Sequence, residues 1–76
     1  MNWRSFARRR WPRAAWISGA GPFATVSDCP PCRTVELHRT RAKAEDTLDF
    51  LREYACGHRC TGRHRIVDLA EVAAVA

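Results

Sequence analysis

Four cysteines in a chain of 76 residues constrain this protein more than any other feature of its sequence. A domain of this size is only marginally stable on its apolar core, and small domains are commonly held by disulfides, a metal ion or a partner. The cysteines form two groups, Cys29-x2-Cys32 and Cys56-x3-Cys60, and the second group continues to His64 after three more residues. This pattern predicts a single domain whose fold depends on a cross-link.

Thiolate and imidazole are the ligands that Zn²⁺ prefers in a tetrahedral site, so the pattern predicts a structural zinc site. The sequence leaves the ligand set open. The simplest set contains the four cysteines, whereas a rival set combines Cys56, Cys60 and His64 with one of Cys29 and Cys32. The two prolines inside the first pair restrict the unfolded chain and thereby favour the bound geometry.

The alternative to a metal site is a pair of disulfides or a set of buried thiols. No apolar stretch of secretory-signal length follows the basic N-terminus, which predicts a reducing, cytoplasmic location where cysteine pairs bind metal more often than they form disulfides. No stretch approaches the ~20 apolar residues of a membrane span. A thioredoxin-like role is disfavoured because a strand-like alternation, and no helix, follows Cys32.

Catalysis is also disfavoured by the sequence. A catalytic zinc ion needs an open coordination position, whereas five candidate ligands predict a closed site. The sequence shows no evident Ser/His/Asp set and no glycine-rich phosphate-binding loop. We therefore expect a non-enzymatic protein without a small-molecule substrate.

The sequence predicts three strands, at residues 23–27, 34–38 and 65–69, and apolar and polar residues alternate in the second of them. The Cys-Pro-Pro-Cys segment lies between the first two. Its two prolines are incompatible with a paired strand, so the segment is predicted to form the turn of an antiparallel hairpin.

Residues 41–55 have the pattern of a helix, with Thr40 as a candidate N-cap. The apolar residues of this helix fall on one stripe: Ala44, Leu48, Leu51 and Ala55. Residues 17–70 are thus predicted to form a small α+β, zinc-ribbon-like domain of order β-β-α-β, in which the helix covers one face of the sheet. The hairpin tip and the helix end would meet at one edge and bring the ligand groups together. Residues 71–76 are expected to be a tail.

The net charge of +5 is confined to the start of the chain. Residues 1–13 contain five arginines and no acid, whereas residues 14–76 carry eight basic and eight acidic side chains. Trp3, Phe6 and Trp11 alternate with these arginines, and Pro12 interrupts any helix. We therefore expect residues 1–16 to be a flexible basic arm outside the folded domain. Trp16, next to the first strand, is expected to cover the protein's own core.

Such an arm suits nucleic acid, because arginines contact phosphates and aromatic rings stack on bases. The predicted contact residues are those of the arm and two that flank the second cysteine group: Arg4, Arg8, Arg9, Arg10, Arg13, Arg59 and Arg63. The predicted partner is nucleic acid or a nucleic-acid machine such as a polymerase or ribosome, and the predicted role is accessory or regulatory. The alternative is a protein-interaction module that docks on an acidic partner surface, because Trp and Arg are favoured interface anchors.

The C-terminal stretch Cys-Gly-His-Arg-Cys-Thr-Gly-Arg-His-Arg-Ile-Val-Asp-Leu, residues 56–69, resembles the CGxxCxxxHxIVDL signature of short zinc-binding proteins from actinobacteria and their phages. Residues 19–24 and 37–45 are similar to those proteins as well. The resemblance implies a metal site in which Cys-x3-Cys-x3-His is the most regular feature, which gives weight to His64. It also implies that one of Cys29 and Cys32 is not a ligand.

Overall fold

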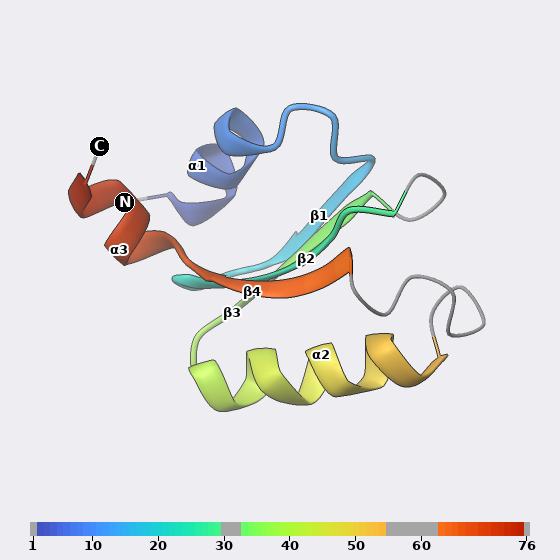
Figure 1. Cartoon of the computed structure of the whole chain (residues 1–76). Helices are drawn as coiled ribbons and strands as arrows, with labels where there is room; N and C mark the ends of the chain where they lie inside the picture. Colours follow the sequence, from blue (N-terminus) through green and yellow to red (C-terminus); the bar gives the residue numbers. More distant parts are fainter. Residues whose placement is uncertain (1, 30–32, 55–62, 76) are drawn as a thin grey trace.

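Figure 1 shows the computed structural model of the chain, which describes residues 2–29, 33–54 and 63–75. A four-stranded sheet lies between α2 on one face and α1 and α3 on the other. The elements in chain order are α1 (Trp3–Arg10), β1 (Trp16–Gly19), β2 (Phe23–Ser27), β3 (Thr34–His38), α2 (Arg41–Tyr54), β4 (His64–Asp68) and α3 (Leu69–Val75). The predicted α+β class is confirmed, and β2, β3, α2 and β4 follow in the predicted order.

The strands lie in the order β1-β3-β2-β4. β2 is antiparallel to both of its neighbours, and its last residue, Ser27, pairs with Thr34 on β3 and with His64 on β4. The antiparallel pairing of β2 with β3 confirms the predicted hairpin, although residues 30–32 of its turn lie outside the described part of the chain. β1, which was not predicted, adds to the edge of β3 in parallel.

The two faces of the sheet differ in polarity. The face toward α1 carries the apolar core, because alternate residues of β2 and β3 point there. The buried members of this core are Ala7, Ala24, Val26, Val35, Leu37 and Leu69. The face toward α2 contains buried polar residues, including Thr25, Ser27 and His64. This small domain therefore buries hydroxyl and imidazole groups in one of its two layers. Each of these buried groups needs a hydrogen-bond partner.

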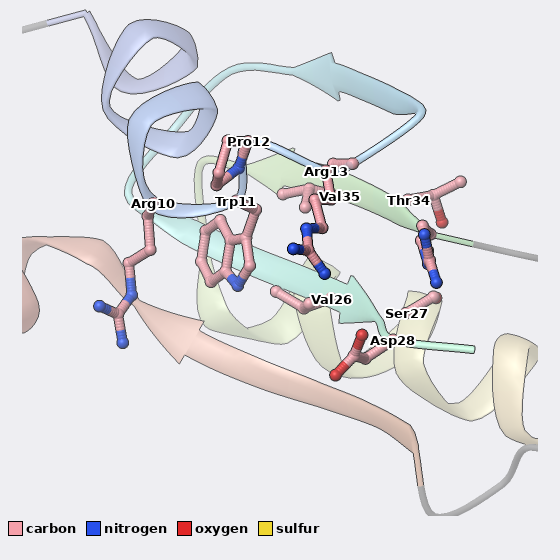
Figure 2. Close-up of a pocket in the computed structure, with 11 residues that line it drawn as sticks. Arg10, Trp11, Pro12, Arg13, Val26, Ser27, Asp28, Thr34 and Val35 are labelled. Atoms are coloured by element: carbon pink, nitrogen blue, oxygen red, sulfur yellow. The ribbon is translucent and has the colours of Figure 1, made fainter. Parts of the chain in front are cut away.

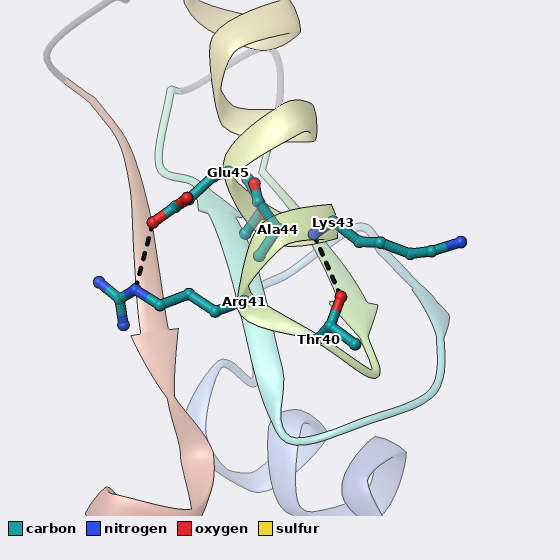
Figure 3. A network of polar contacts seen from close by, with 6 residues as sticks. Thr40, Arg41, Lys43, Ala44 and Glu45 are labelled. Carbon is teal, nitrogen blue, oxygen red and sulfur yellow. Dashed lines mark hydrogen bonds and ion pairs between the residues drawn. The ribbon is translucent and has the colours of Figure 1, made fainter.

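Helix α2 begins as predicted. The hydroxyl of Thr40 accepts a hydrogen bond from the backbone N–H of Lys43 at 3.3 Å, which confirms the N-cap (Figure 3). Glu45 makes an exposed ion pair with Arg41 one turn away, at 3.3 Å. The Oγ1 atom of Thr25 donates to the carbonyl oxygen of Ala44 at 3.1 Å, which ties the helix to the sheet.

The predicted apolar stripe of α2 is confirmed where the structure describes it. Ala44 and Leu48 are buried and Leu51 is half-buried. Ala55 lies outside the described residues. The stripe packs on β2, β3 and β4, so the helix covers one face of the sheet.

The described part of the predicted arm, residues 2–16, does not lie outside the domain but packs on the sheet. Residues 3–10 form α1, and the Asn2 side chain caps it by accepting hydrogen bonds from the backbone N–H groups of Arg4 and Ser5. Phe6 is half-buried and Ala7 is fully buried against the sheet. The physical reason is spacing: Trp3, Phe6 and Ala7 stand at i, i+3 and i+4, which places them on one face of a helix.

Two further predictions near the chain ends need correction. Trp16 does not cover the core, because it lies at the start of edge strand β1 and its side chain is 65% exposed. The tail predicted at residues 71–76 is helical as far as Val75, because Leu69–Val75 form α3. Asp68 caps this helix by accepting hydrogen bonds from the N–H groups of Ala70 and Glu71. Leu69, predicted to end the strand, is instead buried in the core at the start of this helix.

The connection from β1 to β2 requires two glycines. Gly19 and Gly21 have φ angles of 79° and 133°, in the region that side chains with a Cβ avoid. A Cβ at Gly19 would overlap the carbonyl oxygen of Leu37, and one at Gly21 would overlap that of His38. The glycines thus permit the close approach of this connection to β3.

No described helix is both long and apolar enough to span a membrane.

Candidate metal centre and candidate nucleic-acid interface

His64 lies at the first position of β4 and points under α2, and only 1% of it is exposed. Its Nδ1 atom is 2.9 Å from the Ser27 hydroxyl oxygen, on the residue with which it pairs across the sheet. Its Nε2 atom is buried without a hydrogen-bond partner among the described residues. Leaving a buried polar atom unsatisfied costs about 1–3 kcal/mol. A histidine held through one ring nitrogen with the other one open has the arrangement of a metal ligand.

The surroundings of His64 favour the neutral form of its ring. Burial lowers the pKa of His64, and the positive charge of Arg52 in the last turn of α2 lowers this pKa further. The neutral ring is the form that binds metal ions. In the tautomer that carries its proton on Nδ1, the ring donates to the Ser27 hydroxyl and leaves the Nε2 lone pair for a metal.

Cys29 approaches the same end of the sheet. It follows Ser27 by two residues and is fully buried, with 0% exposed. The backbone N–H of Asp28 donates to the carbonyl oxygen of Arg63 at 3.0 Å, which extends the pairing of β2 with β4 beyond His64. The Arg63 guanidinium also donates to the Asp28 carbonyl at 3.3 Å. A buried thiol and a buried imidazole therefore lie on the neighbouring ends of two paired strands.

The structure describes two of the five predicted metal ligands. Cys32, Cys56 and Cys60 lie outside the described residues. The described residues contain no group of three or more potential metal ligands. In the sequence, Cys56 follows Arg52 by four residues and Cys60 precedes His64 by four. The ligand set stays a prediction, and the open Nε2 atom fits the set that includes His64.

The predicted arginines of the arm lie on and just after α1. All five are exposed: Arg4, Arg8, Arg9, Arg10 and Arg13. Two of them also make hydrogen bonds to the backbone: the Arg4 Nε donates to the Gly19 carbonyl, and the Arg8 Nη1 donates to the Ala14 carbonyl. None forms an ion pair with a carboxylate in the described part of the chain. α1 therefore presents positive charge to solvent while its aromatic residues pack inward.

Of the other two predicted contact residues, Arg63 is exposed and directly precedes β4, and Arg59 lies outside the described residues. The arginines of α1 and Arg63 are thus placed by different elements. Among the described residues, no hydrogen bond joins Arg63 to the arginines of α1.

A pocket of about 350 Å³ opens between the end of α1 and the ends of β2 and β3 (Figure 2). Figure 2 shows Trp11 beside Val26 and, farther along β2, Ser27 and Asp28 at the end of the strand. Its charged lining residues are Arg10, Arg13, Arg33 and Asp28. The sequence did not predict this pocket. Arg33 lies near Trp11 and Arg13 only because β1 pairs with β3, and this pairing was not predicted either.

The functional interpretation rests on these residues and their geometry. No protein-family model, curated protein or solved structure matches the chain.

Proposed function

We propose that this protein is a cytoplasmic, zinc-stabilised accessory or regulatory protein that binds nucleic acid, or a nucleic-acid-associated complex, through the basic surface of α1. The proposal has no catalytic step. The observation that carries its zinc part is the buried imidazole of His64, which is held through Nδ1 while Nε2 has no hydrogen-bond partner among the described residues. The signature resemblance of residues 56–69 and the two cysteine spacings support the same metal.

The proposed ligands are His64, Cys56 and Cys60, with Cys29 as the fourth. Cys29 is preferred to Cys32 because it is buried beside the strand pair that holds His64. Zinc at this position would satisfy the Nε2 atom and hold the end of the sheet through sulfur. The positive charge of Arg52, which lies close enough to lower the pKa of His64, would favour the thiolate form that zinc needs.

Metal analysis tests this part of the proposal. Protein purified without chelator is expected to contain about one zinc ion per chain, by elemental assay with free-thiol titration. His64→Ala and Cys29→Ser are each expected to lose the metal. Cys32→Ser is expected to retain it.

His38→Ala is the matched control for His64→Ala. His38 also has a buried Nε2 atom without a partner in the described structure, but no bond to Ser27. This variant should keep its zinc. Absence of metal from the wild-type protein, with its thiols oxidised in pairs, would overturn the zinc proposal.

The nucleic-acid part of the proposal is supported by charge. The exposed arginines of α1 form no ion pair with a described carboxylate, so they can neutralise phosphates and release counterions. The inward packing of Phe6 and Ala7 fixes which side of the helix carries this charge. Residues 1–13 contribute to the core, so single substitutions test this surface better than a deletion.

A filter-binding salt titration measures this interaction. Binding is expected to weaken steeply as salt rises, and Arg9→Gln should lower the slope of log affinity against log salt by about 0.7–0.9 if Arg9 contacts a phosphate. Arg9 makes no hydrogen bond to another described residue, so the fold should be unaffected. Lys43→Gln on α2 removes the same charge and should leave the slope unchanged. No binding at low salt would exclude this function.

The alternative is a protein-interaction module. It is favoured by an exposed aromatic pair on α2, where the ring centroids of Phe50 and Tyr54 are 5.0 Å apart and both side chains are more than 60% exposed. Rigid aromatic groups of this kind are common interface anchors. Protein that contains zinc yet binds neither DNA nor RNA at low salt would support this alternative.

A further inference from the structure

The pocket beside α1 combines an aromatic wall with concentrated positive charge. We propose that it binds one nucleotide unit of a single-stranded nucleic acid, with the base against Trp11 and the phosphate between Arg13 and Arg33. This inference rests on the proposed nucleic-acid function and assigns it a site and a ligand class.

The walls of the pocket are fixed before any ligand binds. The Ala15 N–H donates to the Arg33 carbonyl at 2.7 Å, which joins the segment after α1 to the start of β3. Arg8 donates to the Ala14 carbonyl at 2.8 Å and holds this segment against the helix. Ala14 N–H donates to the Trp11 carbonyl at 3.1 Å and closes the turn between them. A preformed pocket of this kind loses little conformational entropy on binding.

The charge of the pocket fits a phosphate. Among the described lining residues, three guanidinium groups and one carboxylate, that of Asp28, give the pocket two positive charges in excess. Within the described residues, the side chains of Arg13 and Arg33 make no hydrogen bond or ion pair. Their donors are therefore available for bidentate contact with phosphate oxygens.

The aromatic wall fits an unpaired base. Trp11 is half-buried between the core and the pocket, and the Arg10 guanidinium lies 5.6 Å from the centre of its ring. Val26 and Val35 add apolar surface beneath. The volume of about 350 Å³ is at the small end of ligand pockets, which suits one nucleotide. A duplex keeps its bases stacked inside, so only a single strand can place a base against this ring.

Fluorescence titration with an oligothymidylate of about 8 nucleotides tests the site. In a Trp3→Phe/Trp16→Phe background, Trp11 is the sole tryptophan, and its emission should be quenched when the strand binds. Arg13→Gln/Arg33→Gln should weaken binding about tenfold or more at physiological salt, since it removes two charge-assisted contacts. Anisotropy of a labelled strand with otherwise wild-type protein measures the same affinity independently of the tryptophan background.

Arg39→Gln/Lys43→Gln is the matched control, because it removes the same charge around the start of α2. A much smaller loss of affinity in this control supports the pocket. Equal losses in the two double variants, or equal binding of duplex without quenching of Trp11, would overturn the pocket and leave the proposed function standing. Absence of all nucleic-acid binding at low salt would overturn both.

Discussion

Two histidines of this protein share an unusual feature: each has a buried Nε2 atom with no hydrogen-bond partner among the described residues. Their surroundings separate them. His64 has Ser27 on its Nδ1 atom and the buried thiol of Cys29 on the adjacent strand end. His38 ends β3 and pairs across the sheet with Phe23. A nitrogen without a partner is therefore not enough to identify a metal ligand. The hydrogen bond that orients the ring and the nearby sulfur of Cys29 distinguish His64 from His38.

Ser27→Ala tests the orienting role at this scale. Without the hydroxyl the His64 ring loses its fixed orientation, and zinc affinity is expected to fall about 10–100-fold, measured by competition with a chromophoric chelator. Ser18→Ala on β1 is the control and should leave the affinity unchanged. Equal affinities of the two variants would contradict the role of Ser27.

α1 shows how an element gains stability from its surroundings. With 8 residues it is too short to be stable as an isolated helix. The Asn2 cap satisfies two of its first N–H groups, and Ala7 and Phe6 anchor it on the sheet. The helix therefore forms because the sheet offers an apolar surface, and its arginines are fixed in space as a consequence.

Asn2→Ala tests this arrangement. If α1 packs on the core as described, loss of the cap is expected to lower the free energy of unfolding by about 1 kcal/mol, measured by urea denaturation. Asn2→Asp keeps an acceptor for the same N–H groups and should retain most of the stability. Unchanged stability of Asn2→Ala would mean that α1 contributes nothing to the folded state.

At the scale of the whole molecule, the two layers differ in what holds them together. The layer between the sheet and α1 is apolar, whereas the layer under α2 contains Thr25, Ser27 and His64. Hydrophobic burial therefore stabilises the second layer less than the first. The proposed zinc ion would lie at the end of this weaker layer, where its binding free energy would add to the folding free energy.

Metal removal should consequently unfold the protein. Treatment with EDTA is expected to lower Tm by more than about 20 °C or to abolish the transition, because structural zinc contributes more free energy than a domain of this size has in reserve. Circular dichroism measures the transition, and elemental assay verifies that zinc is gone. Adding Zn²⁺, but not Mg²⁺, should restore it. An unchanged Tm in verified metal-free protein would contradict a structural role.

Short-range patterns were enough to predict the central elements. The local composition of β2, β3 and β4 and the apolar stripe and Thr40 cap of α2 depend on neighbours within a few residues, so the sequence alone predicts them. The two cysteine groups and His64 likewise predict a metal site by spacing alone. The burial of Cys29 and His64 at one sheet end fits that prediction without testing the full ligand set.

The tertiary structure decided what the sequence left open. α1 and α3 become helices through burial of Ala7 and Leu69, and the four-residue β1 exists through its pairing with β3. That pairing joins residues almost twenty positions apart and creates the pocket of Trp11, Arg13 and Arg33. Local propensity carries no record of such contacts, because their free energy comes from surfaces that meet only when the chain has folded.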